Sequence, residues 1–91
     1  MLFMSIYTWK PENRDAVVAR RMEIVSAPEG VKRINQWSDV SSGRVITLFE
    51  ADNSLALVAY SRAWSDLGKF EIFPVVETEE VLKAIAASQK K

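Results

Sequence analysis

The sequence predicts an α+β fold in which the elements follow the order strand, helix, strand, strand, helix, strand, with one more helix at the end. Two observations support this prediction. Short runs rich in aromatic and β-branched residues alternate with stretches whose apolar residues recur at helical spacing. Glycine and proline separate these segments, as they do at the ends of helices and strands. This order defines the ferredoxin-like βαββαβ plan, with an antiparallel sheet and both helices on one face.

The composition limits the classes of function. The 91 residues fit one small domain, residues 1–91, and 48% of them are hydrophobic, which is more than a thin core of this size needs. The 12 basic and 12 acidic side chains cancel, so the attraction that drives nucleic-acid binding is missing. The sequence has no cysteine and no histidine, so it lacks thiolate nucleophiles and the commonest metal ligands. We therefore expect no metal, no cofactor and no nucleic acid.

The amino-terminal run is apolar but short. It has no basic leader and is soon followed by Lys10 and Pro11, which predicts a strand and not a signal peptide. No apolar run approaches the length that spans a membrane. We expect a cytoplasmic protein that does not bind a membrane.

The first strand and the first helix are predicted over residues 2–9 and 11–25. Both faces of the strand are apolar, which predicts a central strand that is covered on both sides. The helix has apolar residues at positions i, i+4 and i+7, namely Val18, Met22 and Val25. A proline and a glycine follow residue 25 closely and predict the end of the helix there.

A β-hairpin is predicted next, from strands over residues 31–40 and 44–51. The first of these strands is the more polar, as an edge strand would be. The link Ser41-Ser42-Gly43 is short and contains glycine, as hairpin turns do.

The last three elements are a helix over residues 54–66, a strand over residues 69–77 and a helix that starts at Thr78. Gly68 is the expected stop of the first helix. Pro74 cannot donate a ladder hydrogen bond, so its strand should lie at an edge or carry a bulge. The last helix has an apolar side, and lysines lie toward its carboxyl end. These residues are Val81, Leu82 and Ile85, and Lys83, Lys90 and Lys91.

The second face of the sheet predicts the oligomeric state. Several strands are apolar on both sides, whereas the two crossover helices cover only one face. A second copy of the chain, joined sheet to sheet, would cover the other face. The sequence thus predicts a homodimer with more than about 1,200 Å² of buried surface.

Several short segments in the same order resemble a small prokaryotic family of unknown function within the dimeric α/β-barrel group. The resemblance covers about residues 1–84. The segments are Phe3-Met4, Tyr7-Thr8-Trp9, Pro11-Glu12-Asn13-Arg14, Pro28-Glu29-Gly30-Val31, Trp37-Ser38-Asp39-Val40, Glu50-Ala51-Asp52, Trp64-Ser65-Asp66-Leu67 and Phe70-Glu71-Ile72-Phe73-Pro74-Val75-Val76.

This resemblance implies a fold and the place of a pocket. The wider group includes cofactor-independent monooxygenases, muconolactone-isomerase-like enzymes, haem-binding relatives and ligand-sensing domains, which often hold a small apolar ligand between helices and sheet. The family pattern often has a histidine where this chain has Ser38. Any chemistry of that histidine is absent here, and no histidine can serve as a haem axial ligand.

Three tryptophans are the most suggestive candidates for a binding site. Trp37 and Asp39 lie two residues apart and share a strand face, which Arg33 and Asn35 continue. In the functional interpretation, aromatic rings enclose a planar ligand and a polar residue of this strand holds its polar edge. In the alternative, and commoner, use of such rings, they fill the core or a dimer interface. The predicted ligand-binding residues are Tyr7, Trp9, Arg33, Trp37, Tyr60 and Trp64.

Two aspartates are the candidates for acid–base catalysis. Asp39 and Asp66 stand beside apolar residues that would raise the pKa of each carboxyl. The alternative is that each is an ordinary turn residue at the end of its element. The sequence shows no nucleophile motif and no glycine-rich phosphate loop.

Two functions follow from these patterns. The first is a dimer that binds a small molecule, with cofactor-independent monooxygenase or isomerase chemistry on an apolar or aromatic compound as its enzymatic form. The alternative is a non-enzymatic ligand-sensing or protein-interaction module that uses the sheet face or the last helix.

Overall fold

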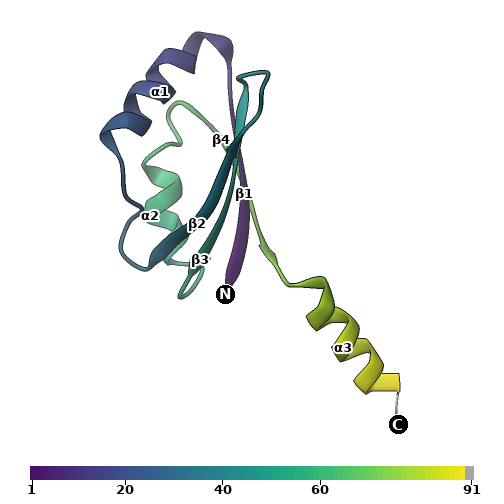
Figure 1. The fold of residues 1–91 in the computed structure, drawn as a ribbon. Coiled ribbons are helices and arrows are strands. Elements are labelled where there is room, and N and C mark those ends of the chain that lie inside the picture. Colours follow the sequence, from purple (N-terminus) through teal and green to yellow (C-terminus); the bar gives the residue numbers. More distant parts are fainter. Residues whose placement is uncertain (90–91) are drawn as a thin grey trace.

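The computed structural model describes residues 1–89, and Lys90 and Lys91, which we expect near the end of the last helix, lie outside this range. The element order confirms the predicted βαββαβ plan followed by a helix (Figure 1). The elements are β1 (Leu2–Trp9), the 3-10 turn η1 (Pro11–Asn13), α1 (Arg14–Glu23), β2 (Val31–Ser38), β3 (Arg44–Ala51), α2 (Ala56–Arg62), β4 (Gly68–Val75) and α3 (Thr78–Gln89).

The four strands form one antiparallel sheet in the order β2-β3-β1-β4. The central place of β1 and the edge places of β2 and β4 are as predicted. On β4, Pro74 lies opposite Phe3, and a residue without an N–H is tolerated there because β4 is an edge strand. Helices α1 and α2 cover one face of the sheet, and the other face is open (Figure 1).

The alternation of side chains along β1 separates the two faces. Phe3 and Tyr7 are buried under the helices, with 5% and 2% of their surface exposed. Met4 and Ile6 point to the other face and are half-buried. The expectation that β1 is covered on both sides therefore holds, within residues 1–89, for the helix side only.

The core under the helices consists of two packed clusters. The first surrounds Phe49, which is fully buried, and the second joins strand, helix and turn residues around Tyr7. Their buried members are Phe3, Phe49, Ala51, Leu57 and Tyr60 in the first, and Tyr7, Val17 and Trp64 in the second.

A β-bulge in β2 corrects the predicted face of several candidate residues. The pairing of β2 with β3 shifts between Arg33 and Asn35, because one extra residue is inserted there. Arg33 pairs with Phe49 on the helix side, whereas Trp37 pairs with Ile46 on the open side. The expectation that Arg33, Asn35 and Trp37 share one face is therefore wrong.

The two crossover helices differ from the prediction in packing and in length. In α1 the buried apolar residue is Val17, whereas Val18, Met22 and Val25 of the predicted stripe are 49%, 76% and 71% exposed. Helix α2 ends at Arg62, before the predicted residue 66, since residues 63–67 form tighter turns.

Helix α3 begins at Thr78 as predicted and extends away from the sheet and the other helices (Figure 1). Every residue from 76 to 89 is exposed. Within residues 1–89, no helix is long and apolar enough to cross a membrane.

Candidate ligand-binding site

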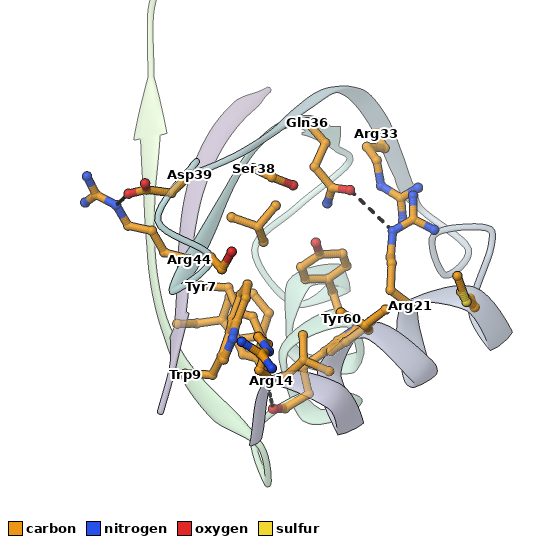
Figure 2. Close-up of a pocket in the computed structure, with 17 residues that line it drawn as sticks. Tyr7, Trp9, Arg14, Arg21, Arg33, Gln36, Ser38, Asp39, Arg44 and Tyr60 are labelled. Atoms are coloured by element: carbon orange, nitrogen blue, oxygen red, sulfur yellow. Dashed lines mark hydrogen bonds and ion pairs between the residues drawn. The ribbon is translucent and has the colours of Figure 1, made fainter. Parts of the chain in front are cut away.

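A cavity of about 380 Å³ lies between α1, α2 and the helix-covered face of the sheet. Its volume is within the range of sites that hold small molecules in proteins. One part of its wall is aromatic and is formed by Tyr7, Trp9, Tyr60, Trp64 and Phe70. The rest includes apolar residues of α1 and polar residues of β2 and of the hairpin (Figure 2).

Tyr7 is at the centre of the aromatic wall. Its ring centroid lies 4.5 Å from that of Phe70 and 5.7 Å from those of Trp9 and Trp64. Its hydroxyl donates a 2.7 Å hydrogen bond to the carbonyl of Trp64. Burial, with a smaller contribution from the charge of Asp66, raises the pKa of Tyr7 to about 12, so the phenol stays protonated at neutral pH.

Gly68 allows the turn before β4 to approach this ring. A Cβ at Gly68 would lie 2.7 Å from Tyr7 Cζ and 2.8 Å from its hydroxyl oxygen, and it would also clash with the carbonyl of Thr8. The approach of β4 to Tyr7 thus requires a residue without a side chain.

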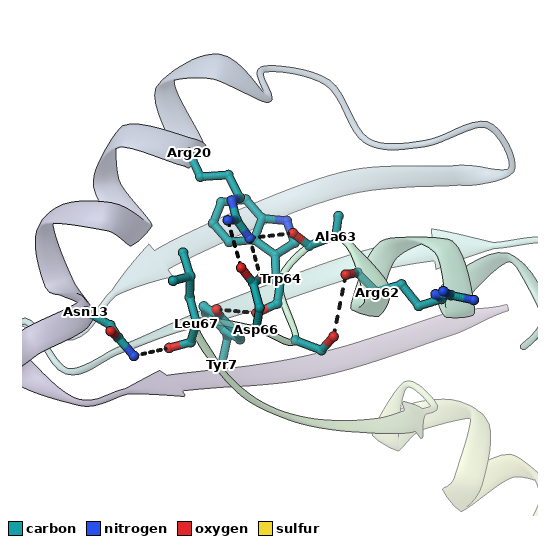
Figure 3. Close-up of polar contacts among 9 residues, drawn as sticks. Tyr7, Asn13, Arg20, Arg62, Ala63, Trp64, Asp66 and Leu67 are labelled. Carbon is teal, nitrogen blue, oxygen red and sulfur yellow. Dashed lines mark hydrogen bonds and ion pairs between the residues drawn. The ribbon is translucent and has the colours of Figure 1, made fainter.

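The turn after α2 binds α1 through polar groups (Figure 3). Arg20 Nη1 and Nη2 donate to Asp66 at 2.5 and 2.9 Å, and Arg20 Nη1 also donates to the carbonyl of Ala63 at 2.9 Å. Asn13 Nδ2 donates to the carbonyl of Leu67 at 3.0 Å. These bonds hold α1 over the aromatic wall.

Both candidate acids have lowered pKa values, which is the opposite of the expected direction. Hydrogen bonds from Arg20 lower the pKa of Asp66. The pKa of Asp39 falls to about 2 because Ser41 and Arg44 donate hydrogen bonds to its carboxylate. The Asp39 contacts are 2.9 Å from Ser41 N and 2.7 Å from Arg44 Nε. Both carboxylates are therefore ionised at neutral pH, and specific donors outweigh the apolar neighbours.

Arginine and glutamine side chains line the part of the cavity beside β2 (Figure 2). Arg21 Nε donates to Gln36 Oε1 at 3.3 Å, and Gln36 Nε2 donates to Thr47 Oγ1 at 2.9 Å. Arg33 Nη1 donates to the carbonyl of Val25 at 3.3 Å. Arg33 Nε is buried, and within residues 1–89 it has no hydrogen-bond acceptor.

The structure brings most of the predicted ligand-binding residues together. Tyr7, Trp9, Arg33, Tyr60 and Trp64 all line the cavity, as does the candidate acid Asp39. Trp37 does not line it, because the bulge directs its side chain to the open face, where it is 47% exposed. Asp66 lies outside the cavity lining and is bound to Arg20.

Helix α1 contributes residues to the cavity that are not among the predicted ligand-binding residues. Arg14, Val18 and Arg21 line the cavity and are spaced at i, i+4 and i+7, so they share one side of the helix. The spacing in the sequence indicates that these residues share a helix side. Because the side carries both charged and apolar residues, it does not have the pattern of a helix face that packs on a core. Within residues 1–89, no cluster of three histidine, cysteine, aspartate or glutamate side chains could hold a metal ion.

The fold and the site define a ferredoxin-like α+β protein with a cavity on the helix-covered face of its sheet. The chain belongs to the family described as a domain of unknown function, DUF3303, which matches residues 1–89. This confirms the predicted membership of a family of unknown function.

Two further comparisons concern curated proteins and solved structures. No curated protein matches the chain. The fold is similar to that in the structure of Rv0793 from Mycobacterium tuberculosis, with a TM-score of 0.54 and 12% identity over 84% of this chain and 94% of that one. At this identity the similarity confirms the ferredoxin-like fold alone.

Proposed function

We propose that this protein binds a small apolar or aromatic molecule in the cavity between its helices and its sheet. The observation that carries the proposal is the aromatic wall around Tyr7, which borders a space of about 380 Å³. Small-molecule sites are largely apolar hollows with a few convergent polar groups, and the arginine and glutamine side chains of α1 and β2 supply such groups here. The proposed ligand-binding residues are Tyr7, Trp9, Arg33, Tyr60 and Trp64.

The protonation states at the cavity favour binding over acid–base catalysis. The carboxylate of Asp39 stays ionised and the hydroxyl of Tyr7 stays protonated at neutral pH. A general acid or base works best when its pKa lies near the working pH. A reaction of the cofactor-independent monooxygenase or isomerase kind would have to take place in this same cavity, through the ligand's own reactivity.

Calorimetric titration with naphthalene-2-carboxamide, a neutral planar probe, tests the binding proposal. We expect saturable binding with one site per chain. Val18→Phe should weaken it, because Val18 lines the cavity and a larger side chain would occupy the space. The matched control is Val58→Phe, since Val58 is equally exposed, 47% against 49%, but lies on α2 outside the cavity lining. Absence of binding, or equal effects of the two substitutions, would contradict the proposal.

We also propose that the open face of the sheet is the interface of a homodimer. Most of its central residues are apolar cross-strand neighbours, with Asn35 and Glu71 as the polar ones; the apolar residues are Met4, Ile6, Trp37, Ile46, Leu48 and Phe73. Trp37 and Phe73 are 47% and 36% exposed. A contiguous apolar surface of this kind is typical of interaction sites. Light scattering should give twice the chain mass of 10.3 kDa, and a monomer would contradict the proposal.

A non-enzymatic interaction module is the second candidate, and α3 favours it. The apolar residues Val81, Leu82 and Ile85 are 43%, 58% and 47% exposed. A helix of 12 residues is only marginally stable in water without packing, so α3 needs a partner surface. Hydrogen exchange of the α3 amides in the purified protein distinguishes between a second copy of this chain and a different protein as the partner of α3. Strong protection would assign α3 to the homodimer and remove this candidate, whereas fast exchange would support a different protein partner.

A further inference from the structure

The charges around the cavity are unbalanced, although the whole chain is neutral. Twelve basic and twelve acidic residues cancel over the sequence. Four arginines and one aspartate line the cavity, so four positive charges against one negative charge leave +3. These residues are Arg14, Arg21, Arg33, Arg44 and Asp39. A hollow lined by one sign of charge raises the local concentration of ligands of the other sign.

Among the residues that the structure describes, two of these four arginines have a carboxylate within 4 Å. Arg44 Nε lies 2.7 Å from Asp39, and Arg14 Nε lies 3.5 Å from Asp15. Within residues 1–89, neither Arg21 nor Arg33 forms a salt bridge. Their known acceptors are neutral, so the positive charge of both guanidinium groups remains uncompensated at the cavity.

Arg21 and Arg33 reach the same end of the cavity from two different elements. Arg21 Nη1 donates to the carbonyl of Ile24, and Arg33 Nη1 donates to the carbonyl of the next residue, Val25, each at 3.3 Å. Both side chains appear at this end, beside Gln36, in Figure 2. Two like charges held together without a counter-ion repel each other, and an anion between them would remove that cost.

Two buried donors at the cavity also lack acceptors. Arg33 Nε and Trp9 Nε1 are buried, and within residues 1–89 neither has a hydrogen-bond partner. Arginine and the indole N–H can only donate, so each requires an oxygen or another acceptor. Buried polar groups are nearly always paired in native proteins, which makes these two donors unusual. A ligand that carries acceptor oxygens would supply partners for donors of this kind.

We propose that the cavity takes a carboxylate-bearing aromatic molecule, with the carboxylate bound by Arg21 and Arg33 and the ring against the aromatic wall. This inference rests on the proposed function and names the class of ligand. The planar guanidinium of Arg33 suits a carboxylate, which can accept two parallel hydrogen bonds. Tyr7 and Trp64 line the same cavity, and their aromatic wall would accommodate the apolar body.

A pair of isosteric probes tests the proposal with the full chain. Naphthalene-2-carboxylate and naphthalene-2-carboxamide have the same ring system and nearly the same shape, but only the first is an anion. We expect the carboxylate to bind about ten- to a hundredfold more tightly by calorimetry, which is the usual gain from a charged hydrogen-bonded pair. The preference should shrink at high NaCl concentration, because salt screens the guanidinium charges.

Substitutions at Arg33 locate the anion. Arg33→Met should abolish most of the preference for the carboxylate over the carboxamide, because it removes the charged donors while keeping an unbranched side chain. Arg33→Lys keeps the charge but loses the paired donors, so it should retain part of the preference. The charge-matched control is Arg62→Met, since Arg62 is exposed on α2 and does not line the cavity. Far-UV circular dichroism checks that each variant is folded.

The outcomes separate this inference from the proposed function. Equal affinity of the wild-type protein for the two probes would overturn the inference and leave the binding proposal intact. Absence of binding by both probes would contradict the binding proposal itself. A carboxylate preference that survives Arg33→Met, or that Arg62→Met reduces equally, would refute the assignment to Arg33. If Arg33→Met does not fold, Arg33→Lys and the two-probe comparison in the wild type decide the question.

Discussion

The two faces of the sheet carry different chemistry, although the same four strands build both. Under the helices, Phe49 and Thr47 are fully buried, and the space that remains is a cavity with arginines along it. On the open face, the neighbours of these residues along β3, Ile46 and Leu48, are only half-buried. Helices of the same chain thus cover one face of the sheet, whereas no element within residues 1–89 covers the other face.

The two faces of the sheet suit two different kinds of partner. The helix-covered face offers uncompensated positive charge and unpaired donors in a confined space, which suits a small ligand rich in acceptors. The open face has an apolar centre with charged residues around it, among them Lys32, Glu50 and Glu71, and such a centre suits another protein surface of the same character. The following experiments test whether the two faces act independently, in order of decreasing expected effect.

The largest effect is expected on the helix-covered face from Gly68→Ala. The new methyl group would meet Tyr7 and the backbone of Thr8, so the free energy of unfolding should fall by about 3 kcal/mol. Gly43→Ala is the matched control, because no atom lies within 4 Å of the added Cβ, and it should cost less than about 0.5 kcal/mol. Urea unfolding at a fixed protein concentration measures both values. Equal stabilities of the two variants would contradict the packing described for Tyr7.

The next effect is expected on the open face from Ile46→Glu. A carboxylate in the middle of the proposed interface would lose its hydration without a partner, so the dissociation constant of the dimer should rise about a hundredfold. Val40→Glu is the control, because Val40 lies in the hairpin and is 100% exposed. Light scattering over a dilution series measures the change. Ligand affinity in the cavity should stay the same, and a parallel loss would show that the two faces are coupled.

A smaller, pH-dependent effect is expected at the hairpin that borders the cavity. Asp39 has a folded-state pKa of about 2, while an unfolded aspartate titrates near pH 4. The carboxylate therefore stabilises the folded state above about pH 4, and this contribution is lost as the pH falls from about 4 to about 2.

Asp39→Asn tests this contribution. The variant should unfold at lower urea concentration than the wild type at pH 7, and the difference should shrink as the pH approaches 2. Asp15→Asn, in which the replaced side chain is 93% exposed, should stay close to the wild type throughout. A difference for Asp39→Asn that is the same at both pH values would rule out this explanation.

The smallest effect is expected in the quenching of tryptophan fluorescence, which should differ between the two faces of the sheet. Trp37 lies on the open face, whereas Trp9 and Trp64 line the cavity. Dimerisation through the open face should therefore lower the quenching of Trp37 by acrylamide as protein concentration rises. Trp37→Phe should remove this concentration dependence. A dependence that persists in the variant would place the interface elsewhere.

The strands could be predicted from the sequence, because the residues that indicate a strand lie within the strand itself. The bounds of β1 and β3 match the prediction residue for residue, since each strand is a continuous run with clear breakers at both ends. The end of α2 could not be predicted from the sequence. It depends on where Gly68 meets Tyr7 and where the Trp64 carbonyl accepts a hydrogen bond, and both contacts join residues about 60 positions apart in the chain.

The candidate site could be predicted in part. Residue type and element are visible in the sequence, whereas contacts between residues far apart in the chain are not. Tyr7, Trp9, Tyr60 and Trp64 were identifiable as aromatic residues on elements that face each other across the fold. The pKa of Asp66 was predicted in the wrong direction because its partner, Arg20, is 46 residues away and belongs to helix α1.

The bulge at Ile34 has a consequence for how this family could diversify. Residues 33 and 37 would share a face in a regular strand, but one inserted residue sends them to opposite sides of the sheet. Loss of the inserted residue in a related chain would place both positions on the same side of the sheet, so that one of them would change the surface it serves. Ligand preference and self-association could thus be altered together by a change in strand length, without altering any residue in the two central strands.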